Sequence, residues 1–294
     1  MSIRTPIVGS PPDPDFTWPR RDPCRSHRWS HRCSPCRSER GFTLVELLVV
    51  LAIVGVLVAL VFAMLAPMRR AALVARDLAQ LRQIAIASAN YAGDHRGRFV
   101  DARLPHGTSP MDETESFAAT LAPYVDGPLA LRSPLDESPH WEDDGAGVPV
   151  GGAGERHRIT SYGLNNHLCR EFSAWGAIDP DRVTDRLSMV PAPAATVHFL
   201  HMAPTGDFAG ADHVHVEEWG GAAQAPTIAA TQCATSIAGG VPGSASARSN
   251  WAFVDGHVET ATFASLYRDL FDNRFDPAEA ATFSLRLAGV PGEP

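Results

Sequence analysis

The sequence predicts an α+β protein in which a long N-terminal helix carries a head with an antiparallel β-sheet. Three observations support this fold class. Residues 42–66 are strongly apolar and uncharged apart from one acid, Glu46. Apolar positions then recur at three- and four-residue spacing to about residue 92, as on one face of a helix. Beyond residue 95, short runs rich in β-branched and aromatic residues alternate with Gly and Pro, a pattern typical of strands joined by turns.

The first 40 residues are rich in Pro, Ser and Arg and have no apolar periodicity, so we expect them to be disordered. They contain cysteines and histidines whose spacing superficially fits zinc: Cys24, His27, His31, Cys33 and Cys36. A misassigned translation start is the alternative explanation of this segment. Neither interpretation gives the segment a role in the mature protein.

Residues 47–66 are twenty consecutive uncharged residues, enough for a helix that spans a bilayer. A secretory signal peptide is the alternative, but its apolar stretch is shorter and is cut at its far end. The carboxylate of Glu46 would be costly in lipid, roughly 2.5–3.5 kcal/mol at mid-bilayer, so we expect it to have a partner. Within about twenty residues of the span, six arginines precede it and four follow it. This bias predicts a cytoplasmic N-terminus.

The segment Gly41-Phe42-Thr43-Leu44-Val45-Glu46 resembles the processing site of type IV pilins and of the pseudopilins of type II secretion. The resemblance implies that a prepilin peptidase cuts between Gly41 and Phe42, removes residues 1–41 and N-methylates Phe42. It also implies that Glu46 pairs with the Phe42 ammonium of a neighbouring subunit in a filament. The implied partners are this peptidase, other pilin-like subunits and a secretion or pilus assembly platform. The chain would cross the inner membrane once, with its head in the periplasm or in an extracellular filament.

Residues 67–94 continue the helix as an amphipathic half, in which Asp77 falls among the polar positions. We expect Pro67 to kink the helix, because proline removes one backbone hydrogen bond and clashes with the preceding turn. We expect Gly93 and the four residues after it to end the helix. Residues 95–294 then form the α+β head.

Local patterns predict the elements of the head. Strands are expected at 159–166, at 195–202 and in a hairpin of 250–254 and 257–260 around Asp255-Gly256. A helix is expected at 276–287, with Asp276 as N-cap and Pro277 at the first helical position, and Gly- and Ala-rich loops are expected at 145–154 and 220–248. Trp251 and Phe253 should share one face of the hairpin by period-two alternation.

The hairpin carries a second resemblance. Asp255, Gly256 and His257 are similar to the end of a C-terminal signature, His, nine residues, then Asp-Gly (H-X9-DG), of a branch of prepilin-like proteins abundant in Planctomycetes. The segments 133–136 (SPLD) and 161–165 (SYGLN) are similar to internal motifs of that branch. The chain departs from the signature at Ala245, which stands at the position of the histidine.

Charge limits the classes of function. The chain has 25 basic residues, all arginine, and 33 acidic residues. Eight of the arginines and four of the acids lie in the first 40 residues. Without that segment, 17 basic and 29 acidic residues remain, a net charge of −12 for the processed chain. An acidic body argues against nucleic-acid binding, which needs a basic face.

Several histidines and acids of the head are candidate metal ligands: His198, His201, His213, His215, His257, Asp207, Asp212, Glu217 and Glu218. His213 and His215 would lie on one strand face, a spacing compatible with Zn²⁺, with Asp212 and Glu217 beside them. The acidic 207–218 loop could hold Ca²⁺, as in some pseudopilins. Ordinary solvated surface groups are the alternative. The sequence has no H-E-x-x-H motif and no nucleophile elbow, so we expect no catalysis and no resident cofactor.

Two cysteines remain after processing, Cys169 and Cys233. In an oxidising compartment they could form a disulfide that closes a 64-residue loop, which the chain-entropy model values at about 4 kcal/mol. The alternative is that they are two unrelated small residues.

These observations predict a structural, pilin-like subunit that assembles into a type II secretion pseudopilus or a type IV pilus-like filament. One alternative is a membrane-tethered binding module that is processed in the same way but never polymerises; it would tolerate Glu46→Ala. A second alternative is a metal-dependent enzyme, which would lose activity when His213 and His215 are replaced.

Overall fold

The computed structural model describes residues 41–107, 113–142, 145–152, 156–174 and 183–287. The chain divides into two compact units, Met1–Leu57 and Val58–Pro294. The β-sheet and every helix that follows the first one belong to the second unit. The cysteine and histidine cluster predicted to fit zinc, residues 24–36, lies outside the described residues.

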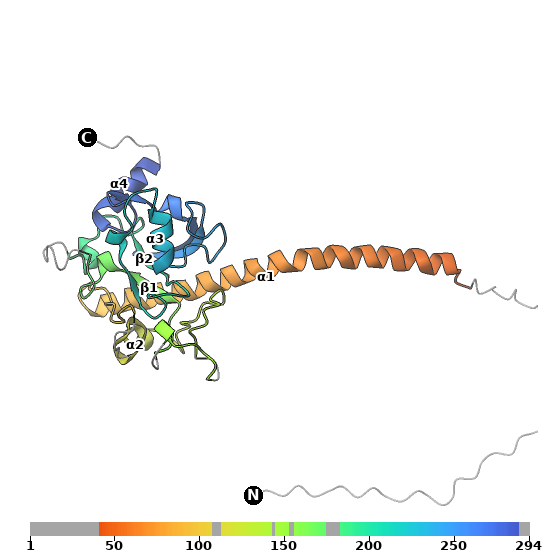
Figure 1. The fold of residues 1–294 in the computed structure, drawn as a ribbon, viewed down its shortest axis with the longest axis horizontal. Coiled ribbons are helices and arrows are strands. Elements are labelled where there is room, and N and C mark those ends of the chain that lie inside the picture. The colour runs from red at the N-terminus through yellow and green to blue at the C-terminus, as the bar shows by residue number, and fades with distance from the viewer. Residues whose placement is uncertain (1–40, 108–112, 143–144, 153–155, 175–182, 288–294) are drawn as a thin grey trace, which may run out of the picture. The chain divides into compact units, whose positions relative to one another are not determined.

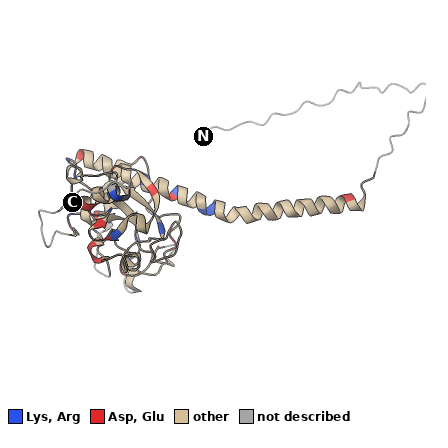
Figure 2. Ribbon diagram, turned by 90° about the horizontal axis from the view of Figure 1, so that it is seen from above, with Lys and Arg blue, Asp and Glu red and all other residues tan. Residues whose placement is uncertain are grey.

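One long helix, α1 (Leu44–Asp94), contains both the apolar and the amphipathic segments and includes Pro67 without ending there (Figure 1). Among the described residues, it is the one helix long and apolar enough to cross a membrane. Figure 2 shows the uncharged stretch of α1 between its early acid and its first arginines. The long N-terminal helix expected from the sequence is therefore confirmed.

The end of α1 has the geometry of a Schellman motif. The amide of Gly97 donates a hydrogen bond to the carbonyl oxygen of Ala92 at 2.7 Å, and Arg96, the residue before Gly97, has a positive φ of 58°. The helix thus stops within the predicted stretch, but Gly93 remains helical. The left-handed position that ends the helix is taken by Arg96 instead.

The head contains a five-stranded sheet in the order β3-β1-β2-β4-β5. Its strands are β1 (Tyr162–Asn165), β2 (Val197–His201), β3 (His213–Val214), β4 (Arg248–Phe253) and β5 (Val258–Thr262). Neighbouring strands are antiparallel except β1 and β3, which are parallel. The predicted antiparallel sheet is confirmed for all the other pairs. After β2, the chain passes β1 and forms β3 as an edge strand on the side of β1 away from β2.

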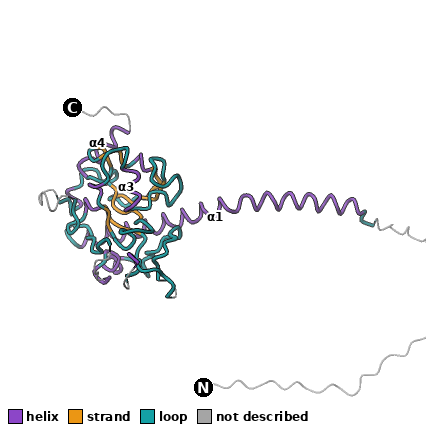
Figure 3. The backbone as a smooth tube through the Cα atoms, in the orientation of Figure 1, coloured by secondary structure: helices purple, strands orange, loops and turns teal. Residues whose placement is uncertain are grey.

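The other helices and strands are short: α2 (Phe117–Leu121), α3 (Ala225–Gln232), β6 (Tyr267–Asp269), β7 (Asp272–Asn273) and α4 (Pro277–Leu287). Single 3-10 turns lie at Glu113–Glu115, Ala122–Tyr124, Val150–Gly152, Asn166–Leu168, Leu187–Met189, Val216–Glu218 and Phe263–Ser265. Loops connect these elements over much of the head (Figure 3).

A β-bulge in β2 determines which of its side chains face α1. The register between β2 and β4 shifts between Val197 and Phe199. In a regular strand, residues three positions apart point to opposite faces. Because of the bulge, Val197 and Leu200 instead belong to the same core cluster. Phe199 belongs to a second cluster, which contains Leu81 and Ile84 of α1. One face of the sheet therefore packs against α1.

The opposite face of the sheet packs against α3 and the C-terminal elements. Trp251 and Phe253 share a cluster with Ala229 of α3 and with Phe275, while Ala252 between them lies in the α1 cluster. The predicted alternation of this strand is confirmed.

Helix α3 contradicts the prediction of a loop over residues 220–248. This stretch is rich in Ala as well as Gly, and Ala has the highest intrinsic helix propensity. Pro226 lies in the first turn of α3. Backbone N–H groups in the first turn make no hydrogen bond within the helix, so the N–H that proline lacks is not needed there. The combination of Pro226 with the alanines after it was the sequence signal for this helix.

The hairpin and the C-terminal helix agree with the sequence. Strands β4 and β5 pair as predicted, and the turn closes with a hydrogen bond from the Gly256 amide to the Phe253 carbonyl oxygen at 2.9 Å. Gly256 has a φ of +88°, a conformation that favours glycine. Asp276 caps α4, since its Oδ1 accepts a hydrogen bond from the amide of Ala278 at 2.9 Å.

Candidate processing site and polar network of the head

Thr43 and Glu46 hydrogen-bond each other at the start of α1. Glu46 Oε2 accepts hydrogen bonds from the Thr43 amide at 2.9 Å and from the Thr43 hydroxyl at 2.8 Å. The Glu46 amide in turn donates to Thr43 Oγ1 at 3.2 Å. This is a capping box, in which Thr43 is the N-cap and Glu46 the third helical residue. The Thr-x-x-Glu pattern that signals this cap is visible in the sequence, so Glu46 has a role within its own helix in addition to the expected role between subunits.

The apolar part of α1 is not covered by any other part of the chain that the structure describes. None of the residues in its most apolar window is buried within the described protein. The exposed fraction is 58% for Leu51 and 67% for Phe62. An apolar surface of this extent is unfavourable in water, at roughly 25 cal/mol per Å². It therefore requires lipid or other apolar helices as its surroundings.

In the head, Asp77 of α1 is the centre of a buried polar network. Its Oδ1 accepts hydrogen bonds from the Ser133 hydroxyl at 2.5 Å and the Tyr162 hydroxyl at 2.8 Å, and lies 2.9 Å from Nε2 of His201. Its Oδ2 accepts a hydrogen bond from Asn250 Nδ2 at 2.6 Å. The Asp77 and His201 side chains are fully buried. The network joins α1 to three strands of the sheet.

This network keeps Asp77 ionised. Burial alone raises the pKa of Asp77, but the attraction of His201 and the hydrogen bonds from His201, Ser133 and Asn250 outweigh it and lower the pKa to about 2. The pKa of Tyr162 is raised, because burial and the adjacent Asp77 both disfavour the phenolate. The network therefore holds one negative charge at neutral pH, on Asp77.

A second buried acid, Asp136, pairs with Arg158. Arg158 Nε lies 2.8 Å from Asp136 Oδ2, and both side chains are 1% exposed. The guanidinium also donates to the carbonyl oxygens of Met202, Ala203 and Ala209. Burial lowers the pKa of Arg158, and Asp136 opposes that effect. The pair ties the 133–136 segment to the chain after β2.

The two acids are linked through Ser133 and Ser161, which come from the two internal segments noted in the sequence. The Ser133 amide donates to Ser161 Oγ at 2.8 Å, and the Ser161 hydroxyl donates to Asp136 Oδ2 at 2.6 Å. A continuous chain of hydrogen bonds thus connects Asp77 with Arg158. The spacing of Asp77 predicts a place on the polar side of the helix, which is wrong: Asp77 is buried, because folding brings its partners together.

The candidate metal ligands do not converge. His201 contacts Asp77, and His257 stacks on Phe253, with ring centroids 4.2 Å apart. His198 is buried against Phe99, and burial lowers its pKa to about 3. These three histidines thus lie in separate surroundings.

His213 and His215 are close to each other, with ring centroids 5.0 Å apart. The acids beside them already have partners: Asp212 accepts hydrogen bonds from the amides of Arg103 and Leu104, and Glu217 accepts one from Asn166. Within the described residues, no group of three or more His, Cys, Asp or Glu is arranged to hold a metal ion. The Zn²⁺ and Ca²⁺ sites remain predictions.

Cys169 and Cys233 are both free and buried. Cys169 lies in the core cluster that contains α1, and Cys233 lies in the cluster that contains α3, on the other face of the sheet. Burial raises the pKa of both thiols. The structure therefore does not form the predicted disulfide, because the sheet separates the two thiols.

Comparison with known proteins bears on the start of the chain. The family model described as the prokaryotic N-terminal methylation motif matches residues 36–62. The match includes Gly41, Phe42 and Glu46 and ends within the apolar part of α1. No curated protein and no solved structure gives a significant match. The motif indicates a precursor like those of type IV pilins and pseudopilins.

Proposed function

We propose that this chain is a structural pilin-like subunit that assembles into a type II secretion pseudopilus or a type IV pilus-like filament. One observation carries the proposal: the N-terminal methylation motif at 36–62 covers the start of a helix whose apolar window is left uncovered by the described residues. Packing of such helices against one another, after extraction from lipid, would bury that surface. The protein is not proposed to be an enzyme.

Processing would create the charge pair on which assembly depends. Cleavage between Gly41 and Phe42 leaves an ammonium at Phe42, and N-methylation retains its positive charge. In a low-dielectric surrounding, this ammonium and the Glu46 carboxylate of a neighbouring subunit attract each other strongly, whereas each alone is costly. A subunit whose charges lack these partners is therefore less stable in the filament. This favours the one alignment of neighbouring helices along the filament axis that brings the two charges together.

The head would be fixed to the upper half of α1 and displayed on the outside of the filament. The Asp77 network and the cluster around Leu81 and Ile84 bind this half of α1 to the sheet. Before assembly, the subunit would lie in the inner membrane with its N-terminus in the cytoplasm. Its partners would be the prepilin peptidase, other pilin-like subunits and the assembly platform.

The test compares three forms of the full-length chain in native host cells: wild type, Glu46→Gln and Glu46→Ala. Gln at the third helical position can preserve a capping box, so Glu46→Gln removes the charge and keeps the helix cap. We expect the wild type to begin at N-methylated Phe42 by mass spectrometry and to enter sheared filament fractions. Both variants should be processed but absent from filaments.

Two outcomes would contradict the proposal. The first is a mature protein that still begins upstream of Phe42. The second is a Glu46→Gln variant that assembles as well as wild type while Glu46→Ala does not, which would show that Glu46 acts only as a helix cap.

A further inference from the structure

A cavity of about 450 Å³ opens in the head between α1, the 135–139 segment and the residues that follow α3. Its volume lies within the range of small-molecule sites, ~300–1,000 Å³. Apolar side chains contribute to its lining, among them Leu135, Met202 and Ile237. A mixed apolar and polar lining suits a ligand that is itself amphiphilic.

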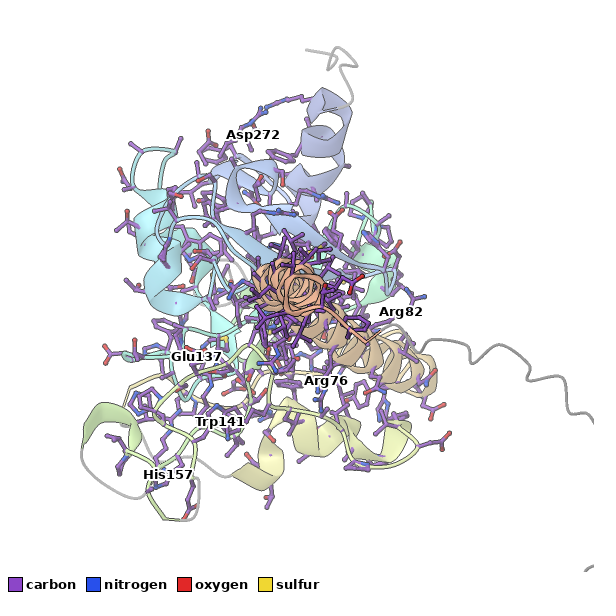
Figure 4. The ribbon with its side chains drawn as sticks, turned by 90° about the vertical axis from the view of Figure 1, so that its right-hand side faces the viewer. Arg76, Arg82, Glu137, Trp141, His157 and Asp272 are labelled. Atoms are coloured by element: carbon purple, nitrogen blue, oxygen red, sulfur yellow. The ribbon has the colours of Figure 1, made fainter. Side chains whose placement is uncertain are left out.

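Two opposite charges line this cavity without pairing with each other. The Arg70 guanidinium donates a hydrogen bond to the Ile237 carbonyl oxygen at 3.1 Å, and it has no carboxylate partner among the described residues. Glu137, labelled in Figure 4, has neither a hydrogen bond nor an ion pair with them. The other acid of the lining, Asp136, is already held by Arg158. A ligand with one positive and one negative group would match Arg70 and Glu137.

The position of Arg70 along α1 gives the depth of the cavity relative to a membrane. The predicted membrane span, residues 47–66, ends four residues before Arg70, which corresponds to ~6 Å at the rise of an α-helix. The headgroup layer on each side of a bilayer is about 5–7 Å thick. If the apolar part of α1 spans the membrane, Arg70 lies at the depth of lipid headgroups.

The lining discriminates between headgroups. The carboxylate of Glu137 would repel a headgroup with a net negative charge. A choline headgroup is recognised by aromatic rings, and none of the described residues that line the cavity is aromatic. A primary ammonium, in contrast, can donate hydrogen bonds to a carboxylate such as Glu137.

We propose that this cavity binds the phosphoethanolamine headgroup of a membrane phospholipid. Arg70 contacts the phosphate, and Glu137 accepts hydrogen bonds from the ammonium. The lipid would hold the head at a fixed height above the membrane before assembly. This proposal rests on the membrane anchor of the proposed function, but it does not require that the chain polymerises.

The experiment is native mass spectrometry of the processed full-length protein in detergent. Phosphatidylethanolamine, phosphatidylcholine and phosphatidylglycerol are added at equal concentrations, and soluble phosphoethanolamine is added in a separate arm. We expect phosphatidylethanolamine to bind about tenfold more tightly than the other two lipids, since a charge-assisted hydrogen bond is of that order. Soluble phosphoethanolamine should bind much more weakly, because it lacks the membrane-anchored tail.

Each cavity variant has a matched control that makes the same charge change nearby. Glu137→Gln should lose the preference about tenfold, whereas Arg70→Gln should weaken the binding of all three lipids by a similar factor, because Arg70 contacts the phosphate that they share. Arg69→Gln and Glu142→Gln change residues outside the lining and should leave the preference unchanged. Glu137 is exposed, so its variant is expected to fold, and thermal melting followed by circular dichroism checks this.

Equal binding of the three lipids by the wild type, an unchanged preference in Glu137→Gln, or undiminished lipid binding by Arg70→Gln would overturn the proposal. Soluble phosphoethanolamine that binds as tightly as the lipid would overturn the lipid as the source of the headgroup. Extraction of the wild-type protein from membranes by alkaline carbonate is a separate readout. A protein released by carbonate would refute the membrane anchor, whereas a protein that is retained but shows no lipid preference would refute this site alone.

Discussion

Asp77 on α1 and His201 on β2 are in direct contact, with 2.9 Å between Asp77 Oδ1 and His201 Nε2 and no solvent exposure of either side chain. The two residues are 124 positions apart in the sequence. A carboxylate inside the head is tolerated because every one of its near neighbours donates to it. The contact therefore acts as a polar attachment of the helix to the sheet within an otherwise apolar interface.

The first prediction concerns the removal of this charge. Asp77→Asn should lower the free energy of unfolding of the head by about 2–4 kcal/mol, because the hydrogen bonds to a buried carboxylate are lost or weakened. Asp94→Asn, at the end of the same helix, is the matched control and should change it by less than about 0.5 kcal/mol. Urea unfolding of the full chain in detergent, followed by tryptophan fluorescence, measures both. Equal effects of the two substitutions would contradict the prediction.

The second prediction is the pH dependence of the same group. The pKa of Asp77 falls from 3.8 to about 2 on folding, so the unfolded chain binds a proton more readily than the folded one. The resulting stability, of the order of 2 kcal/mol, is fully present above about pH 5 and is lost as the pH falls toward 2. The difference in the free energy of unfolding between the wild type and Asp77→Asn should therefore become smaller as the pH falls from 5 to 3. A constant difference over that range would show that the carboxylate is not involved.

The third prediction compares a buried with an exposed ion pair. Arg158→Met leaves Asp136 charged and unpaired in the core and should destabilise the head by about 3–5 kcal/mol. Arg268→Met removes an exposed partner of Asp272, whose 3.3 Å contact should contribute less than about 1 kcal/mol. The same urea unfolding experiment measures both variants. Similar losses for the two variants would mean that burial does not determine the effect.

The elements that the sequence predicted well are those with a local cause. The hairpin follows from Asp255-Gly256 between two alternating runs, since Gly256 can adopt the positive φ that the turn needs. Helix α4 follows from Asp276 and Pro277, which form its first turn. The apolar half of α1 follows from its composition alone. In each case the residues that determine the structure are neighbours in the sequence.

The features that the sequence did not predict depend on distant partners. Asp77 has the spacing of a surface residue, and its burial depends on Ser133, Tyr162, His201 and Asn250, from four separate segments. A strand is expected at His213 and His215, but β3 has only two residues, His213 and Val214, and no local pattern encodes its parallel pairing with β1. The separation of the two cysteines by the sheet follows from the strand order, which no local pattern encodes.

The fourth prediction separates two roles of glycine. An added Cβ at Gly256 or at Gly93 meets no atom within 4 Å, so any effect of alanine there comes from the backbone. Gly256→Ala should destabilise the head by about 1–2 kcal/mol, because its φ of +88° is unfavourable for other residues. Gly93→Ala, inside α1, should stabilise it by about 0.5–1 kcal/mol. Thermal unfolding of both variants tests the prediction, which fails if the two shifts have the same sign.

The fifth prediction concerns the two thiols of the processed protein. Burial raises the pKa of Cys169 and of Cys233, so little thiolate is present at pH 8 and both should react slowly with a thiol reagent while the protein is folded. In denaturant without reductant, both should react, giving two thiols for each processed chain; Cys233→Ala should give one. A wild-type protein that releases thiols only after reduction would instead contain the disulfide, and the two strand faces would have to rearrange to form it. The proposed processing would remove Cys24, Cys33 and Cys36, so the count is made on protein that begins at Phe42.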